Sequence, residues 1–166
     1  MPSTYDKLAT ASISGVSSYT FSSISSSYTD LVLVVTPIVS VSNDYIRIRF
    51  NGDAGTNYRS TGIRGNGSSA TSSSFTAQTG IYLGTAKGGE TAIPLNAIVD
   101  INSYRNSTFK TCLIRYSNDQ NGAGSVERHN GMWSSTAAIT SITVYSNGGN
   151  NFSTGSIATL YGIVKA

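Results

Sequence analysis

The chain has 166 residues, of which 11% are charged and 39% are hydrophobic, and its formal net charge is +3. Soluble proteins carry roughly 25% charged residues, so the surface must be largely neutral, while the hydrophobic share excludes a disordered chain. The Lys and Arg residues are scattered without a basic run, which disfavours nucleic-acid binding, and the single Cys112 excludes an internal disulfide framework.

Short β-branched and aromatic runs recur along the whole chain between clusters of Gly, Asn, Ser and Asp, without helical periodicity. This pattern predicts strands, in chain order, at residues 8–13, 19–24, 30–35, 44–50, 58–63, 78–85, 97–104, 110–116, 127–133, 140–145 and 157–164. Two packed antiparallel sheets bury so many strands without leaving long open edges. We therefore expect an all-β fold, with residues 1–166 forming a single domain, a two-sheet antiparallel sandwich of jelly-roll-like topology.

For three of these runs the sequence also predicts which faces of the strand are buried. The runs 30–35 and 157–164 are almost continuously apolar, which is typical of strands in the middle of a sheet or at a subunit contact. In the run 110–116, Cys112 points to one face and Leu113 to the other, which indicates a strand covered on both sides. Cys112 itself is most simply a small core residue.

Turns are predicted where the chain needs residues that tolerate positive φ. These are residues 51–53, 65–67, 87–89, 121–122 and 147–149. Two Ser-rich stretches, 22–27 and 68–74, are candidates for mobile loops, and neither is long enough to be an interdomain linker.

His129 is the one histidine of the chain, so a serine triad or a multi-histidine metal site must be built around it. No G-x-S-x-G elbow presents a nucleophile. A hydrolase would need a serine, His129 and a carboxylate to meet in space. We favour a histidine at a strand end, packed beside Trp133, and predict no catalytic residues.

The acidic residues are dispersed, and nothing singles out a carboxylate pair or a calcium loop. In the segment 51–57, Asp53 and Asn57 are candidate ligands of a cation, together with backbone carbonyls. An oxygen-rich β-turn has the same composition, and we favour the turn. We predict no cofactor and no metal.

Seven segments of the chain resemble a known protein family. They are Thr4-Tyr5-Asp6-Lys7-Leu8-Ala9-Thr10; Phe21-x-x-Ile24 with Tyr28-Thr29-Asp30-Leu31-Val32-Leu33; Arg49-Phe50-Asn51-Gly52-Asp53-Ala54-Gly55-Thr56-Asn57-Tyr58; Tyr104-Arg105-Asn106-Ser107-Thr108-Phe109-Lys110-Thr111 with Gly131-Met132-Trp133-Ser134-Ser135-Thr136-Ala137-Ala138-Ile139-Thr140; and Asn151-Phe152-x-x-Gly155-Ser156-x-x-Thr159-Leu160-Tyr161-Gly162-Ile163. Together they span nearly the whole chain. On these residues the chain resembles small virion structural proteins, of the capsid decoration or cement type, from cyanobacterial and marine tailed phages.

The resemblance implies a place in a virus particle and carries no catalytic residues. A compact chain without a coiled-coil shaft or repeats fits a decoration protein better than a fibre. We expect it to bind the major capsid protein on the capsid exterior as a homotrimer, after synthesis in the bacterial cytoplasm, with no membrane or nucleic-acid partner. The alternative is a tail or fibre-tip module that binds host-surface glycans through exposed Tyr and Trp side chains.

Overall fold

A computed structural model describes residues 4–39, 41, 44–85, 93–119 and 122–164, and these residues form strands, turns and loops without a helix. The strands are β1 (Tyr5–Ser12), β2 (Ser18–Phe21), β3 (Asp30–Thr36), β4 (Ile46–Phe50), β5 (Tyr58–Gly65), β6 (Ala70–Gln78), β7 (Ile81–Tyr82), β8 (Asn96–Asn102), β9 (Lys110–Asn118), β10 (Ser125–Trp133), β11 (Ile142–Ser146) and β12 (Ile157–Ile163). The part of the chain that is described therefore contains no helix that could cross a bilayer.

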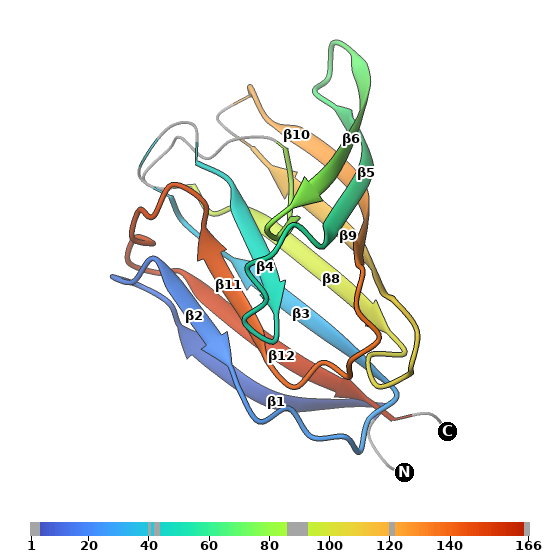
Figure 1. Ribbon diagram of the computed structural model, residues 1–166. Coiled ribbons are helices and arrows are strands. Elements are labelled where there is room, and N and C mark those ends of the chain that lie inside the picture. Colours follow the sequence, from blue (N-terminus) through green and yellow to red (C-terminus); the bar gives the residue numbers. More distant parts are fainter. Residues whose placement is uncertain (1–3, 40, 42–43, 86–92, 120–121, 165–166) are drawn as a thin grey trace.

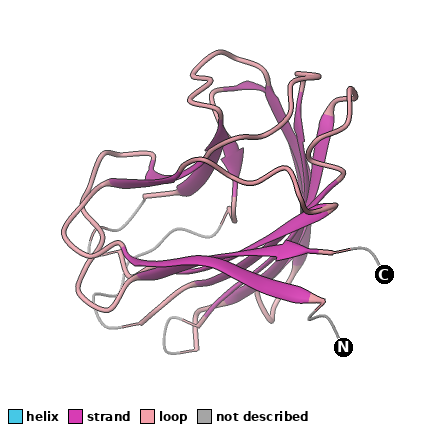
Figure 2. Ribbon diagram, turned by 90° about the horizontal axis from the view of Figure 1, so that it is seen from below, coloured by secondary structure: helices cyan, strands magenta, loops and turns pink. Residues whose placement is uncertain are grey.

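The strands form two antiparallel sheets that pack face to face, with β2, β4 and β11 in front of β3, β8 and β12 (Figure 1). The view from below shows the two layers edge-on (Figure 2). The first sheet has the order β1-β12-β3-β8-β9-β10-β5-β6, and the second has the order β2-β11-β4-β7. The predicted all-β sandwich is confirmed.

The strand order is that of a jelly roll with an extension. The quartets β1-β12-β3-β8 and β2-β11-β4-β7 face one another, and the chain alternates between them as in two interleaved Greek keys. Two hairpins, β5–β6 and β9–β10, then lengthen the first sheet from four strands to eight. The β5–β6 hairpin projects beyond the body of the sandwich (Figure 1).

The core lies between the two sheets because alternate residues of each strand point inward. Leu31, Leu33 and Val35 of β3 are fully buried there, and they face Ile48 and Val144 of the second sheet. In β3 and β12 the predicted position inside the sheet is confirmed, since both strands have a neighbour on each side. On the outer face Ile157 of β12 is nevertheless 45% exposed.

Some predictions from the sequence about the fold are wrong. Residues 68–74, expected as a mobile loop, run into the nine-residue strand β6, because pairing with β5 supplies order that Ser-rich composition does not reveal. Leu113 of β9 was expected to be covered but is 46% exposed, since nothing in the described chain packs on that face of the sheet. The predicted turn 87–89 and Asn121 of the turn 121–122 lie outside the described residues.

The turn after β4 has the predicted positive φ angles, and it organises one end of the sandwich. Asn51 (φ 51°) and Gly52 (φ 68°) are both left-handed, and the N–H of Asp53 donates to the carbonyl of Phe50 at 2.9 Å, which is a type I′ turn. Asn51 then spans to the segment before β11: its Nδ2 donates to Ala138 O at 2.8 Å, and its Oδ1 accepts from the N–H of Thr140 at 2.8 Å.

Three aromatic side chains pack beneath this turn. Trp133 of β10 stacks on Tyr58 of β5 with ring centroids 6.3 Å apart, and Phe50 of β4 tilts against Trp133 at 5.7 Å. The Tyr58 hydroxyl accepts from the N–H of Phe50 at 3.1 Å and donates to the carbonyl of Asp53 at 3.0 Å. The aromatic cluster therefore ties the extension of the first sheet to the second sheet.

Lys110 adds a further tie at the same end. Its side chain is 1% exposed, yet its Nζ donates to the carbonyls of Thr108 at 2.6 Å, Asn106 at 2.7 Å and Thr136 at 3.3 Å. Burial lowers the pKa of this ammonium group. Segments 51–58, 104–111 and 131–140 thus meet at one end of the sandwich.

We predict that Tyr58→Phe destabilises the protein by about 1–3 kcal/mol, because the buried N–H of Phe50 loses its acceptor. Denaturant unfolding monitored by Trp133 fluorescence measures this change. The control is Tyr5→Phe, at a side chain 56% exposed. Equal stability of the two variants would contradict the role given to the Tyr58 hydroxyl.

Candidate functional site

His129, the one candidate for acid–base chemistry, lies in the middle of β10 and not at a strand end beside Trp133, so that expectation is wrong. Its side chain is fully buried on the inward face of β10. Its Nε2 lies 2.6 Å from Oε2 of Glu127, which occupies the same inward face of β10. Its Nδ1 has no partner among the described residues.

Glu127 is the centre of this buried polar cluster. Its Oε2 accepts hydrogen bonds from the N–H of Thr85 at 2.6 Å and the hydroxyl of Thr85 at 2.9 Å. Its Oε1 accepts from the Ser125 hydroxyl at 3.3 Å and lies 3.7 Å from Nε of Arg64. A buried carboxylate needs such a set of donors to offset its desolvation.

The cluster pins the segment after β7 against the extension. The second sheet ends at β7, so among the described residues the inner face of the extension is covered by β7 itself and by the short chain that leads from it to Thr85. The side chains of Glu127 and His129 are both 0% exposed. The structure therefore does bring a carboxylate, a serine and His129 together, but in an arrangement closed to solvent and suited to a structural bond.

Asp53 lies in the predicted turn, where N–H donors surround its carboxylate. Oδ1 accepts from the N–H of Gly55 at 2.8 Å, and Oδ2 accepts from Nδ2 of Asn57 at 2.9 Å and from Nε1 of Trp133 at 2.7 Å. Asn57 thus offers its nitrogen and not its oxygen to this site. These contacts, led by that of Trp133, lower the pKa of Asp53, and they favour the turn over a cation site.

The remaining candidate residues serve the core. Burial raises the pKa of the Cys112 thiol to about 12, and Cys112 lies on the inward face of β9. Trp133 is 3% exposed and Tyr58 is fully buried, so neither offers a platform for a sugar ring. Within the described ranges no three His, Cys, Asp or Glu side chains group closely enough to hold a metal.

The outer face of the extension is the feature that the sequence analysis did not single out. Directly opposite one another on β8, β9, β10 and β5 lie, in that order, Ile98, Arg115, Arg128 and Ile63. We call this line the arginine row. Ile63 is 63% exposed, and both arginines are exposed as well.

A second line, two residues along each strand, is made mostly of small side chains. It comprises Asn96, Ser117, Val126, Gly65 and Ala70 on β8, β9, β10, β5 and β6. We call it the small-residue row. Because these side chains are short beside the arginine row, the face is hollowed to a volume of about 580 Å³, and Val126 within it is 67% exposed.

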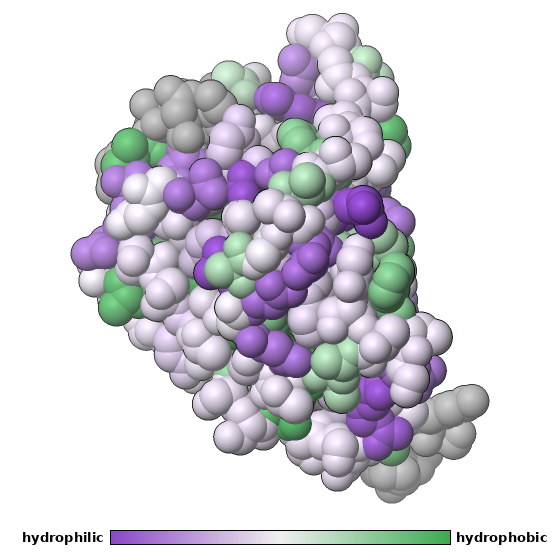
Figure 3. Space-filling model, in the orientation of Figure 1, coloured by the Kyte–Doolittle hydropathy of each residue, from purple (hydrophilic) through white to green (hydrophobic). Residues whose placement is uncertain are grey.

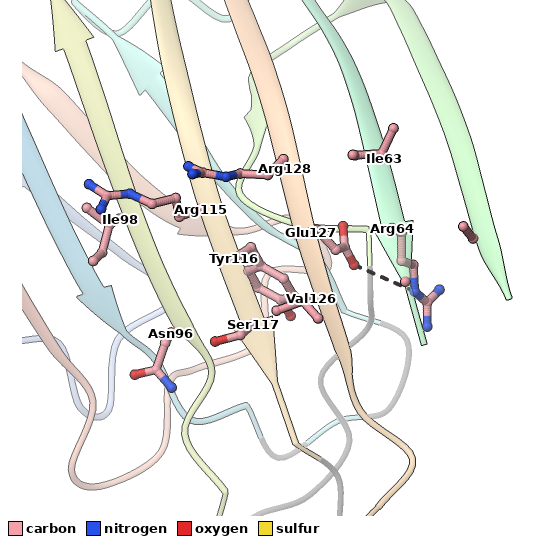
Figure 4. A pocket seen from close by; sticks show the side chains of 12 residues that line it. Ile63, Arg64, Asn96, Ile98, Arg115, Tyr116, Ser117, Val126, Glu127 and Arg128 are labelled. Atoms are coloured by element: carbon pink, nitrogen blue, oxygen red, sulfur yellow. Dashed lines mark ion pairs between the residues drawn. The ribbon is translucent and has the colours of Figure 1, made fainter. Parts of the chain in front are cut away.

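Figure 4 shows how the hollow is built. The side chains of Arg115 and Arg128 run in the same direction across the strands, toward β8, with Ile98 at one end of the row and Ile63 at the other. Arg64 and Glu127, whose ion pair is dashed, also line the hollow; the side chain of Glu127 is buried, whereas that of Arg64 is 36% exposed (Figure 4). The β-sheet therefore forms the floor of the hollow, and aliphatic and guanidinium groups form its edges.

The opposite face of the molecule is different. Over β2, β11 and β4 the surface is mostly pale or purple, with scattered green groups (Figure 3). Its larger side chains are used internally: Arg47 stacks on the ring of Tyr82 at 3.9 Å, and Arg49 on that of Tyr145 at 4.6 Å. These cation–π contacts cover one face of the Tyr82 ring and one face of the Tyr145 ring.

In comparisons with known proteins, no family model, no curated protein and no solved structure matches this chain. The function of the chain must therefore be inferred from its own residues and their geometry.

We expect the stability contributed by Asp53 to depend on pH in the acid range. Its pKa is lowered in the folded protein from the value of 3.8 that applies without these contacts, so the contribution is complete well above pH 3.8 and is lost as the pH falls through the folded pKa. Unfolding of the native protein and of Asp53→Asn should differ at pH 6 and converge toward pH 2. A difference that stays constant over this range would contradict the assignment.

Gly62→Ala should destabilise the protein by about 1–3 kcal/mol through overpacking. Gly62 lies opposite His129, and an added methyl carbon would stand 2.1 Å from Nδ1 of that buried ring. The matched control is Gly65→Ala on the same strand, where nothing lies within 4 Å of the added carbon. Thermal unfolding compares the two variants, and equal melting temperatures would show that the ring is not held where the structure places it.

Proposed function

We propose that this chain is a non-catalytic structural protein of a tailed-phage virion, a decoration or cement protein that binds the capsid exterior. The observation that carries the proposal is the outer face of β8, β9, β10 and β5, where Ile63 and Val126 in the hollow and Leu113 beside it stand exposed on a molecule with few charged residues. Exposed apolar side chains that cluster over neighbouring strands are typical of protein contact surfaces.

The architecture supports an assembly role. The jelly-roll quartets form a rigid body, and the hairpins β5–β6 and β9–β10 are added to it only on one side, where they build the hollow. Jelly rolls occur in viral capsid proteins and also in lectins, so the fold alone does not decide the function. The resemblance to phage virion proteins favours the first of these.

The polar groups favour binding over catalysis. The carboxylate and histidine that a hydrolase would use are sealed inside the extension, and Glu127 is already saturated with donors. Glycan binding loses support for a similar reason, because Trp133 and Tyr58 are engaged in the aromatic cluster. We therefore propose that the chain attaches to the major capsid protein as a homotrimer.

The test is made on particles of the phage that encodes the chain. Quantitative mass spectrometry of purified virions should give a copy number near that of the major capsid protein, whereas a tail module would be present in a handful of copies. The mass of the purified protein in solution tests the trimer. Absence of the chain from purified virions would refute a virion role.

The binding face is tested by adding purified variants back to particles that lack the chain. Val126→Asp should weaken binding at least about ten-fold, because a charge is placed in the apolar contact. Val16→Asp is the matched control, since Val16 is also an exposed valine but lies in the turn between β1 and β2. Wild-type binding by a folded Val126→Asp variant would refute the assignment of this face.

A further inference from the structure

The arginine row contains a charge pair that the fold itself does not explain. Arg115 and Arg128 are directly opposite one another on β9 and β10. Like charges in that position destabilise a sheet. A surface that serves only to keep the protein soluble gains nothing from this juxtaposition.

The two arginines differ in how their charges are balanced. Both Asp100 oxygens accept from Nη2 of Arg115, at 3.0 and 3.2 Å. Arg128 has neither an ion pair nor a hydrogen bond to any residue within the described ranges. One guanidinium group therefore stands unneutralised on the rim of the hollow.

The surroundings of Arg128 would strengthen its interaction with an anion. Ile63 lies opposite it on β5, and the apolar Val126 stands two residues away on the same face of β10. A partner that covers these side chains excludes water from the site. A charge-assisted hydrogen bond is stronger there than at a solvent-exposed position. The hollow thus combines exposed apolar side chains with Arg128, whose charge no described residue neutralises.

On the proposed function, which this inference deepens, we infer that the hollow binds an extended acidic segment of the partner protein. A Glu or Asp carboxylate of that segment bonds Arg128 in the arginine row, and an aliphatic side chain fills the space at Gly65 in the small-residue row. Gly65 leaves that space open, since no atom lies within 4 Å of where its side chain would begin. A nucleic acid would instead require several unpaired cations.

The distance between the two rows determines how far apart in sequence the acidic and aliphatic residues of the bound segment lie. They are two residues apart on each strand, which is about 6.6–6.8 Å. In an extended peptide that runs along the strands, side chains at positions i and i+2 lie on one face with the same spacing. The acidic and aliphatic residues of the segment are therefore separated by one residue.

The test uses the full-length protein and three synthetic probes. The first is acetyl-Thr-Glu-Ser-Leu-Thr-amide, in which Glu and Leu share a face. The second replaces Glu by Gln, and the third exchanges Ser and Leu so that Glu and Leu fall on opposite faces. Binding is followed by NMR through the methyl signals of Ile63, Ile98 and Val126.

The first peptide should shift these methyl signals and bind at least about five-fold more tightly than each of the other two. In Arg128→Gln its advantage over the Gln peptide should disappear, while it persists in the control Arg59→Gln, at an exposed arginine on the same face of β5. Equal binding of the Glu and Gln peptides, no binding of any peptide, or a preference that survives Arg128→Gln would overturn the inference.

Two further outcomes separate this inference from its premises. Hexanoate, a free carboxylate on an aliphatic chain, should bind more weakly than the first peptide, and equal affinity would overturn the assignment to a protein segment. If the peptides show no acid preference but Val126→Asp still blocks attachment to particles, the inference falls and the proposed function stands. If Val126→Asp attaches normally, the assignment of this face to particle binding falls whatever the peptides do, whereas absence of the chain from purified virions refutes the proposed function itself.

Discussion

The antiparallel pairing of β10 with β5 on one side and β9 on the other is the constraint on which both faces of the extension depend. Its register is continuous over Ser125–Trp133, without a bulge. Because side chains alternate along a strand, this single register sends Glu127, His129 and Trp133 inward and Val126 and Arg128 outward. A slip of one residue would expose the buried carboxylate and bury the free arginine.

The inward side of β10 explains how four extra strands can be carried by a jelly roll. The second sheet ends at the two-residue strand β7 and does not reach across the extension. Two contacts replace the missing sheet: Glu127 holds the chain at Thr85, and Trp133 holds the turn at Asp53. The extension is therefore fixed by a polar clamp at one point and an aromatic clamp at another, and its outer face can remain open.

Segments 51–58, 104–111, 131–140 and 151–163 lie mainly in such fixing contacts and not at the hollow. The side chains of Asn51 and Lys110 donate hydrogen bonds to backbone carbonyls of the loops that cross the end of the sandwich. Phe152 pairs with Val39 at the far end, and Gly162 leaves room for the ring of Tyr28. Residues of this kind preserve a fold, whereas a surface that meets a partner is freer to change.

The sequence by itself determined the all-β class, most of the strands and the turn at Asn51-Gly52, because these follow from local alternation and from backbone preferences of single residues. It did not reveal β6, whose Ser-rich strand is ordered by β5, nor the bond between Glu127 and His129, since neither partner is marked by a motif. The hollow was hidden for the same reason: its two rows draw residues from strands far apart in the chain. Only the tertiary pairing of those strands decides that Arg128 stands beside Arg115 and that Gly65 leaves a space next to Val126.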